Sequence, residues 1–233
     1  GWSKWCTLMP LPKNGGFAYG NNQAIHPSLT GPDSPELVLL LNPDTLVLPG
    51  ALRELMKFMD ASPDVGIAGA RCENRDGSVR RSAFRFHSIR GEFERGANVG
   101  IISKILKNQI TAPPLRNDLH RVDWVSGACM MVRRSVFKKI GLLDDGYFMY
   151  YEETDFCLRA ARAGFACWYV PAARIIHLVG QSSGVTGAAK ALKRRPKYWF
   201  DARHRYFLRN YGVLKTLAAD FAWGCGLLIG RTW

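Results

Sequence analysis

Closely spaced cysteine pairs are missing from this sequence. Its 233 residues include 5 histidines and 6 cysteines, the latter at Cys6, Cys72, Cys129, Cys157, Cys167 and Cys225. No two cysteines form a C-x-x-C pair, which argues against a zinc ribbon and a thioredoxin-like redox motif. Most of them lie in apolar stretches, so we interpret them as small core residues of a protein in a reducing compartment.

Acidic residues are scarce relative to basic ones. The chain has 19 Asp and Glu against 32 Lys and Arg, and its formal net charge is +13. This charge implies an anionic partner and leaves nucleic acid, anionic lipid and a phosphorylated substrate open. Hydrophobic residues make up 47% of the chain, which excludes a disordered protein, and the length suits one large domain or two small ones.

A long, uninterrupted apolar run is absent as well. The apolar C-terminal segment 213–229 contains Lys215 and Asp220, so it favours an interfacial helix over a transmembrane span. No signal peptide precedes the first polar loop, and the glycine-rich stretch 14–22 is typical of a connection within a fold. We therefore expect the natural protein to extend upstream of Gly1.

The pattern of residues 37–70 predicts an α/β fold. Apolar runs at 37–41 and 65–70 are typical of buried strands, and the helix between them has one apolar face, formed by Leu52, Leu55, Met56 and Met59. This order indicates a parallel α/β unit. Elsewhere we expect a helix at 22–28, a variable basic excursion over the active face at 73–121, and a strand at 129–132. A helix with Ser135 as N-cap that ends at Gly141, a helix at 152–163, and extended segments at 165–170 and 174–178 follow.

Asn42, Pro43 and Asp44 directly follow the first predicted strand. Open α/β sheets bind ligands beyond the carboxyl ends of their strands, so Asp44 lies where a ligand is expected. Magnesium and manganese bind through one or two carboxylates together with substrate phosphates. The same residue types are common in turns, and this motif alone supports a turn-capping role of Asp44 equally well.

A second acidic cluster, Glu152, Glu153 and Asp155, begins the predicted helix 152–163. The helix dipole favours acids in a first turn, which explains all three structurally and is slightly favoured on these residues alone. The alternative is catalytic. The flanking aromatic residues would bury a carboxylate in part, raise its pKa and suit it to general-base work.

His177 and the C-terminal basic residues can each be interpreted in two ways. His177 ends an apolar run and is either a metal ligand or a core histidine, and a core histidine is the more common case. The polar loop 180–184 that follows it is expected near a phosphate. Lys and Arg are interleaved with aromatic residues from 190 to 209, which suits nucleic acid or anionic lipid. The apolar segment after them favours a membrane surface.

Taken in order, these segments resemble the family 2 glycosyltransferases, the large inverting GT-A group, and within it the bacterial rhamnosyltransferase-like members. The matching stretches are 14–22, 40–45, 124–128 and 148–155, followed by His177, Gly180 and Ser182. The resemblance implies a mixed α/β sheet of GT-A type flanked by helices, in a catalytic domain at 1–188, with a basic, aromatic, helical extension at 189–233. Family members begin with nucleotide-binding strands that have no counterpart here, so we expect the first strands of the sheet to be missing.

The resemblance also implies roles for single residues. Asp44 stands at the last acid of the family's metal-binding D-x-D element, Asn42 replaces its first acid, and His177 completes the metal shell in some relatives. Glu153 matches the catalytic base, and Glu152 is the second candidate. The acceptor pocket and the nucleotide loop are implied at two further sets of residues, respectively Trp124, Gly127, Ala128 and Asp155, and Asn14, Gly16 and Asn22.

We therefore expect an inverting enzyme that uses Mn²⁺ or Mg²⁺ and a dTDP- or UDP-sugar, with rhamnose favoured. Its acceptor would be a saccharide or lipid-linked saccharide in cell-envelope polysaccharide synthesis, with Arg80 or Arg81 steadying the diphosphate. We expect it in the cytoplasm, peripheral on the inner face of an anionic membrane, without nucleic acid. Two alternatives stay open: a non-catalytic basic module that binds nucleic acid or membrane, and a metal-dependent phosphotransferase or hydrolase.

Overall fold

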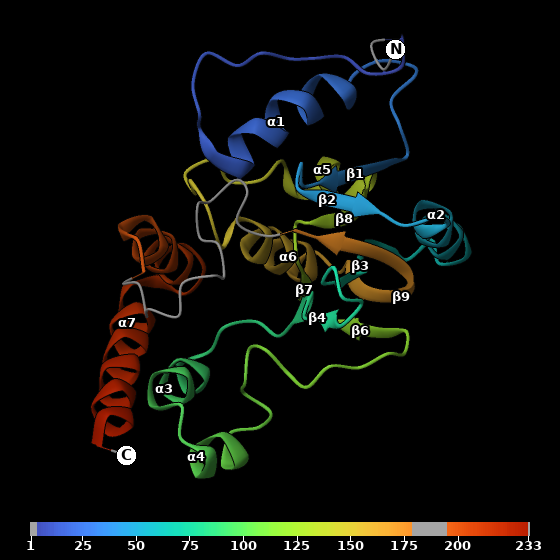
Figure 1. Ribbon diagram of the computed structural model, residues 1–233. Coiled ribbons are helices and arrows are strands. Elements are labelled where there is room, and N and C mark those ends of the chain that lie inside the picture. The colour runs from blue at the N-terminus through green and yellow to red at the C-terminus, as the bar shows by residue number, and fades with distance from the viewer. Residues whose placement is uncertain (1–3, 179–194, 233) are drawn as a thin grey trace.

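A mixed β-sheet forms the centre of the protein. The structure, a computed structural model, describes residues 4–178 and 195–232. The main path of the sheet has the order β1-β8-β3-β9-β2 (Figure 1). These strands are β1 (Leu37–Leu41), β8 (Cys129–Arg133), β3 (Val65–Glu73), β9 (Ala166–His177) and β2 (Thr45–Val47). β8 lies antiparallel between β1 and β3, and β3 pairs in parallel with β9.

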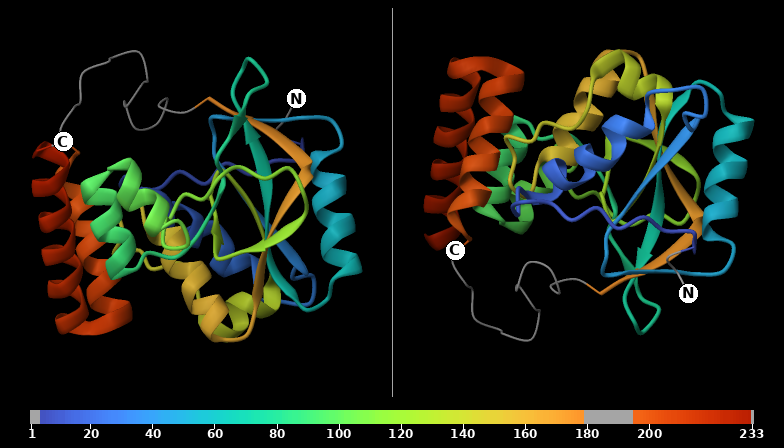
Figure 2. Two further views of the ribbon diagram at one scale, coloured as in Figure 1. Left: turned by 90° about the horizontal axis from the view of Figure 1, so that it is seen from below. Right: turned by 90° about the horizontal axis from the view of Figure 1, so that it is seen from above.

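Helices cover both faces of this sheet (Figures 1 and 2). They are α1 (Gly16–Ser28), α2 (Ala51–Ala61), α5 (Arg134–Ile140) and α6 (Glu152–Arg162). Neighbouring residues of β3 point to opposite faces: Ile67 belongs to the core under α1, α5 and α6, whereas Ala68 packs under α2. The predicted α/β class with a mixed sheet is therefore confirmed.

The excursion at 73–121 contains helices and strands that the weak pattern of its sequence did not predict. It contains the short strands β4 (Val79–Arg80) and β5 (Ala83–Phe84), the helices α3 (Ile89–Ala97) and α4 (Gly100–Ile105), and the start of β6 (His120–Val122). β4 and β6 extend the main sheet, while β5 pairs with β7 (Trp124–Val125). Two-residue strands are too short for a hydrophobic period to reveal them.

Several predicted boundaries also need correction. α1 begins at Gly16, not at 22, and Gly16 takes φ +87°. Ser135 lies inside α5, whose N-cap position is Arg133. Leu52 and Met56 are 40% and 51% exposed, because α2 turns Ala51, Leu55 and Met59 to the sheet instead. The two extended segments after 164 are one strand, β9, whose pairing with β3 shifts register near Arg71.

Four of the six cysteines are free and buried in the core, as predicted: Cys72, Cys129, Cys157 and Cys167. Cys6 is exposed and Cys225 is half-buried. Burial raises the pKa of the Cys72 thiol to about 11, so it stays protonated and unreactive at neutral pH.

The C-terminal helix α7 (Lys197–Thr232) is two helices folded against each other. The chain turns at Gly212, where φ is 79°. The turn brings Arg203 to Asp220 in an ion pair and places the Trp199 ring 6.1 Å from that of Trp223. Within the described residues α7 is the one helix long and apolar enough to cross a membrane, and most of its apolar stretch is exposed.

α7 docks closely on α3. A Cβ atom added at Gly226 would lie 2.3 Å from the Phe93 carbonyl oxygen, and one at Gly96 would lie 2.4 Å from that of Trp223. Glycine at both positions therefore lets the two backbones approach. The predicted helical extension thus packs on the excursion 73–121, while its residues 189–194 lie outside the described part of the chain.

A buried ionic cluster stabilises the contact between α3 and α7. Glu92 of α3 is fully buried, and its carboxylate accepts hydrogen bonds from Arg203 at 2.6 Å and Arg95 at 3.2 Å and lies 3.2 Å from His87 Nδ1. Burial would raise the pKa of Glu92, but the hydrogen bond to His87 and the charges of Arg95 and Arg203 lower it to about 2. The carboxylate is therefore ionised and its charge is neutralised by its neighbours.

Replacing Arg203 with leucine is expected to lower the free energy of unfolding by about 3 kcal/mol or more, because it deprives a buried charge of a partner. The pKa of Glu92 is lower in the folded chain, so its stabilisation is present above the ordinary glutamate pKa and lost as the pH falls toward 2. Urea unfolding at pH 7 measures the loss. Lys197→Leu is the matched control, because it breaks the exposed Lys197–Asp201 pair and should cost under about 1 kcal/mol. Equal losses in both variants would contradict the role of the cluster.

Candidate functional site

Asn42, Asp44 and His177 meet at one edge of the sheet. Asn42 and Asp44 lie in the turn between β1 and β2, and His177 ends β9, where it pairs with Thr45. His177 Nε2 lies 3.1 Å from Asp44 Oδ1 and 3.3 Å from Asn42 Nδ2. Two backbone bonds fix the arrangement, from Asn42 N to the Ala128 carbonyl at 3.1 Å and from the Leu178 amide to the Asp44 carbonyl at 2.9 Å.

The electrostatics of this cluster favour the binding of a cation. Burial lowers the pKa of His177, the Asp44 carboxylate opposes this effect, and the charge of Arg80 lowers the pKa further. A neutral imidazole offers a free nitrogen lone pair. Asn42 Oδ1 is buried without a hydrogen-bond partner. Among the described residues no three His, Cys, Asp or Glu side chains lie together as a metal cluster, and this site combines one Asp and one His with the Asn42 amide.

Glu153 lines a separate cavity of about 250 Å³. Its walls come from β5, the start of β7, α3, the start of α6 and α7, with Phe84, His87, Arg95, Thr111, Ala112, Trp124, Tyr150, Tyr151, Glu153, Thr154 and Trp199. Glu152 is 4% exposed and is not among the lining residues. Only Glu153, the first of the two candidates that the family resemblance implied, therefore lines the cavity.

Strained backbone positions the start of α6. Tyr150 and Tyr151 have φ of 73° and 70°, in the left-handed region that large side chains rarely adopt. The Tyr151 hydroxyl accepts a hydrogen bond from Arg95 at 3.3 Å, and its ring lies 5.9 Å from that of Trp199. Such strain costs about 1–3 kcal/mol and persists where the surroundings enforce it, commonly at functional sites.

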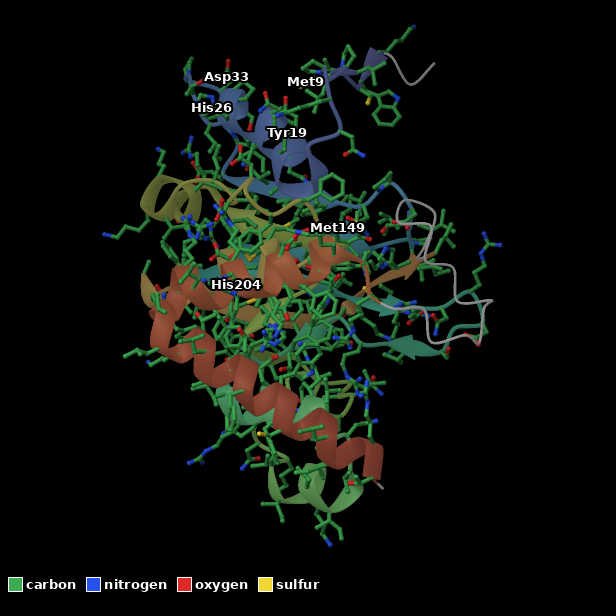
Figure 3. All side chains as sticks on the ribbon, turned by 90° about the vertical axis from the view of Figure 1, so that its left-hand side faces the viewer. Met9, Tyr19, His26, Asp33, Met149 and His204 are labelled. Atoms are coloured by element: carbon green, nitrogen blue, oxygen red, sulfur yellow. The ribbon has the colours of Figure 1, made fainter. Side chains whose placement is uncertain are left out.

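The loop before α6 is also held between α1 and α7. The Phe148 carbonyl accepts a hydrogen bond from the Phe17 amide at 3.2 Å, and the Phe148 ring lies 5.8 Å from that of Tyr198. Figure 3, seen from the α7 side, shows Met149 of this loop between the two helices. A Cβ at Gly16 would lie 1.8 Å from the Phe148 carbonyl oxygen, so only glycine permits this contact.

The two glutamates hold their protons unusually tightly. Burial raises the pKa of both carboxyls, and the neighbouring Glu153 charge raises that of Glu152 further. Hydrogen bonds from backbone amides, including that of Gly127, partly oppose the rise at Glu153. Glu153 Oε2 is buried and, like Glu152 Oε2, has no hydrogen-bond partner among the described residues. A carboxylate with a raised pKa is a stronger base.

Residues 124–128 connect the two sites. Trp124 lines the cavity, stacks on Phe84 at 4.2 Å and donates its indole hydrogen to the Arg85 carbonyl at 2.9 Å. Gly127 packs against the Phe17 ring, and the Ala128 carbonyl accepts the hydrogen bond from Asn42. A single stretch of chain therefore reaches from the cavity to the Asp44 turn.

The side chains of three predicted site residues contact neither the Asp44 cluster nor the Glu153 cavity. Asp155 is fully buried and accepts hydrogen bonds from Arg159 at 2.8 Å and Asn210 at 2.7 Å, so it ties α6 to α7. Asn22 exchanges hydrogen bonds with the Leu143 backbone, and Asn14 accepts one from Gly16. We interpret these side chains as structural, in place of the acceptor and nucleotide roles predicted for them. The loop 180–184 lies outside the described residues.

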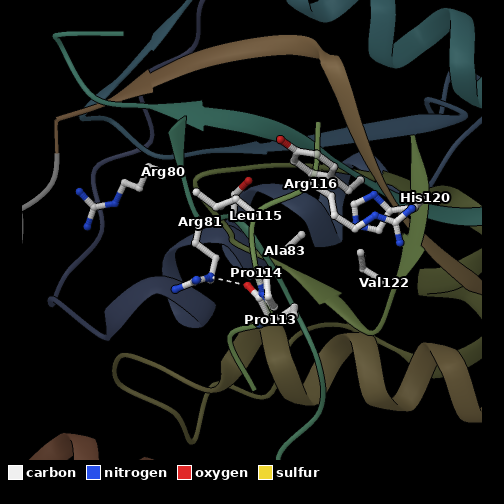
Figure 4. A pocket seen from close by; sticks show the side chains of 11 residues that line it. Arg80, Arg81, Ala83, Pro113, Pro114, Leu115, Arg116, His120 and Val122 are labelled. Atoms are coloured by element: carbon white, nitrogen blue, oxygen red, sulfur yellow. Dashed lines mark hydrogen bonds between the residues drawn. The ribbon is translucent and has the colours of Figure 1, made fainter. Parts of the chain in front are cut away.

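Arg80 and Arg81 differ in what they contact. Both line a small pocket at the end of β4 (Figure 4). Arg81 Nε donates to the Pro113 carbonyl at 2.9 Å, whereas Arg80 points away from that bond (Figure 4). The positive charge of Arg80 lowers the pKa of His177. Arg80 is therefore the better placed of the two to act near Asp44.

The sequence predictions missed the cavity residues Arg95, Trp199 and His87. Arg95 lies on α3, His87 just before α3, and Trp199 on α7, and these residues meet at the cavity because α3 and α7 pack together. The basic and aromatic pattern around Trp199 had been assigned to a surface. No local signal marks a side chain that depends on a contact of this kind.

Comparison with known proteins gives a consistent result. A model of the family described as "Glycosyl transferase family group 2" matches residues 37–232. The chain is 28% identical over 230 residues to an N-acetylglucosaminyl-diphospho-decaprenol L-rhamnosyltransferase of Mycobacterium tuberculosis, with 90% of this chain and 74% of the relative covered. It is 30% identical over 165 residues to the rhamnosyltransferase WbbL of Escherichia coli, with 70% and 60% covered.

A solved structure shares the fold. The chain matches a crystal structure of GalNAc-T7 with UDP, GalNAc and Mn²⁺ at a TM-score of 0.53 and 12% identity. The match covers 76% of this chain and 33% of the other. It supports the GT-A-type arrangement of the sheet and its helices.

Proposed function

The chain belongs to glycosyl transferase family group 2, and from that membership we propose that Glu153 is the base of an inverting sugar transfer. The enzyme is a glycosyltransferase that uses a nucleotide-sugar donor. The observation that carries the proposal is that Glu153, and not Glu152, lines the cavity together with Trp124. The roles that follow for the other residues are part of the same proposal.

The Asp44 cluster fits a divalent metal. Its polar atoms are Asp44 Oδ1 and His177 Nε2, which lie 3.1 Å apart, and the Asn42 amide oxygen, which has no hydrogen-bond partner among the described residues. Oxygen and imidazole ligands suit Mn²⁺ and Mg²⁺ with few protein carboxylates, since substrate phosphates supply the rest. Asp44, His177 and Asn42 would hold the ion, which when bound would neutralise the donor diphosphate.

The proposed chemistry uses the chain's own groups at both reacting ends. Glu153 accepts the proton of an acceptor hydroxyl while that oxygen forms a bond to the anomeric carbon of the donor sugar. The bond between the anomeric carbon and the diphosphate oxygen breaks on the opposite face, and the leaving diphosphate stays at the Asp44 turn. Arg80 places a further positive charge beside it.

Rhamnose is the proposed sugar, carried by a dTDP or UDP nucleotide. The support comes from the relatives' names: rhamnosyltransferases of Mycobacterium tuberculosis and Escherichia coli, and a dTDP-rhamnosyl transferase of Shigella flexneri that is 26% identical over 185 residues. The proposed acceptor is a lipid-linked saccharide of the cell envelope.

We place the enzyme in the cytoplasm, on the inner face of the membrane. In the second half of α7, Leu214, Leu217, Phe221 and Leu228 are between 59% and 83% exposed. The first three fall at i, i+3 and i+7, so they form one apolar stripe. With the net charge of +13, this suits an anionic bilayer surface.

A donor panel tests the function. The chain, with the upstream coding sequence restored where the gene has one, is incubated with Mn²⁺ and nucleotide-sugars, and nucleoside diphosphate release is measured. We expect release from a rhamnose donor, increased by a lipid-linked acceptor and abolished by EDTA. Release of inorganic phosphate or nucleoside monophosphate instead would indicate the phosphotransferase or hydrolase alternative and contradict the proposal.

Arg80→Ala is expected to raise the KM for the donor about tenfold or more, because a charge-assisted contact to a diphosphate contributes about 1.5–3 kcal/mol. Arg81→Ala is the matched control, since it removes the same charge from a side chain that bonds to Pro113 instead. Steady-state kinetics with varied donor measure both. If the two variants change KM equally, Arg80 has no specific role at the diphosphate.

A further inference from the structure

A second cavity lies next to the Glu153 cavity. It has a volume of about 380 Å³, within the usual range for small-ligand sites, and it opens between the start of α3 and the middle of α7. His87 lines both cavities and is itself 7% exposed. The two cavities therefore share one wall.

The lining of this second cavity is amphiphilic. Ile89, Phe207 and Tyr211 supply apolar and aromatic surface, and Arg90 and Lys215 supply two positive charges. Lys215 Nζ lies 5.7 Å from the centre of the Tyr211 ring. Neither cation forms an ion pair with any residue in the described ranges 4–178 and 195–232, and no acidic side chain lines the cavity.

Such a lining is complementary to an anion joined to a hydrocarbon. Two unpaired cations recognise phosphate oxygens, and the apolar side chains cover adjoining hydrocarbon. The second half of α7, which begins after the turn at Gly212, also carries the exposed apolar stripe of Leu214, Leu217 and Phe221. The helix that supplies Lys215 to the cavity therefore also presents apolar surface that suits a bilayer.

We propose that the cavity between Arg90 and Lys215 binds the diphosphate and first isoprenoid carbons of a polyprenyl-diphosphate-linked acceptor. This assignment rests on the proposed function and gives the acceptor a place: lipid diphosphate on one side of His87, sugar on the Glu153 side. Arg90 and Lys215 are positioning residues, which hold the acceptor without touching the reacting atoms.

Calorimetric titration with farnesyl diphosphate tests the site without needing activity. We expect binding by the unaltered chain, weakened about tenfold or more in Arg90→Ala/Lys215→Ala, because two charge-assisted contacts are lost. Farnesol and inorganic diphosphate should each bind more weakly than farnesyl diphosphate. The control is Arg53→Ala/Lys57→Ala, which removes the same charge from exposed positions of α2, on the far side of the sheet from α7 (Figure 2).

Kinetics separate this proposal from the general one. In Arg90→Ala/Lys215→Ala we expect a raised KM for a lipid-diphosphate acceptor and unchanged nucleoside diphosphate release with a lipid-free saccharide acceptor. Equal weakening in the α2 control, or equal binding of farnesol, would overturn the site while leaving the glycosyltransferase intact. Loss of binding to anionic vesicles without loss of farnesyl diphosphate binding would likewise overturn it and indicate a general membrane contact.

Discussion

Glu153→Gln is expected to lower kcat about 10²- to 10⁴-fold, the range typical of a lost general base. Glutamine keeps the shape of the side chain in the cavity but accepts no proton. Because burial raises the pKa of Glu153, activity of the unaltered enzyme should rise with pH along a limb that lies above the ordinary glutamate pKa. Initial rates across pH, with donor and acceptor saturating, measure both effects.

Glu152→Gln is the matched control for this prediction. Glu152 is buried beside Glu153 but lies outside the cavity lining, so kcat should fall far less. A larger loss in Glu152→Gln than in Glu153→Gln would transfer the role of base to Glu152.

The variants Glu152→Gln and Glu153→Gln are also expected to change how stability depends on pH. A carboxyl whose folded pKa is raised favours the folded state below its unfolded pKa, and this contribution is lost as the pH rises through the folded pKa. Glutamine does not ionise, so either Glu→Gln change removes this loss of stability. The free energy of unfolding of each variant, relative to that of the unaltered chain, should therefore increase from pH 5 to pH 8. Urea unfolding at both pH values checks the sign. A gain at pH 5 that disappears at pH 8 would contradict the burial account.

Asp44→Asn is expected to lower kcat/KM for the donor by about 10²- to 10³-fold, the usual effect of removing one group that stabilises developing negative charge. Asp60→Asn, an exposed position at the end of α2, is the control and should change little. Comparable losses in the two variants would remove Asp44 from the donor site.

A second measurement on Asp44→Asn needs no substrate. The Asp44 carboxylate raises the pKa of His177, against burial and the charge of Arg80, so its removal should lower the pKa of this histidine. An NMR titration of the histidine ring in metal-free protein follows the shift. An unchanged His177 pKa would mean that the two side chains do not interact in solution.

The Asp44 turn and the acidic helix start could be predicted because their signals are local. The apolar run of β1 passes directly into Asn42 and Asp44, and the acids of α6 follow an aromatic stretch within a few residues. His177 was found through its place at the end of an apolar strand. Periodicity and the rule that ligands bind beyond the carboxyl ends of strands located these segments, whereas the roles predicted for Asp44, Glu153 and His177 came from the family resemblance.

Assignments that depended on distant contacts could not be predicted in this way. Asp155 lies in the same first turn as Glu153 but points to Asn210 of α7, some fifty residues away in the chain. The left-handed conformation of Tyr150 and Tyr151 is imposed by Arg95 and the rings of α7, and no propensity rule anticipates it. The contacts of side chains outside the core depend on how helices pack together. No local pattern in a single sequence shows this packing.

The most direct test of the account is a ¹H NMR spectrum of the glycoside formed by the full chain with a rhamnose donor and a saccharide acceptor. The account predicts one nucleoside diphosphate per glycoside and inversion at the anomeric carbon, with no product from Glu153→Gln on the same timescale. Retention of anomeric configuration, or product at the normal rate from Glu153→Gln, would contradict the assignment of Glu153 as the base of an inverting transfer.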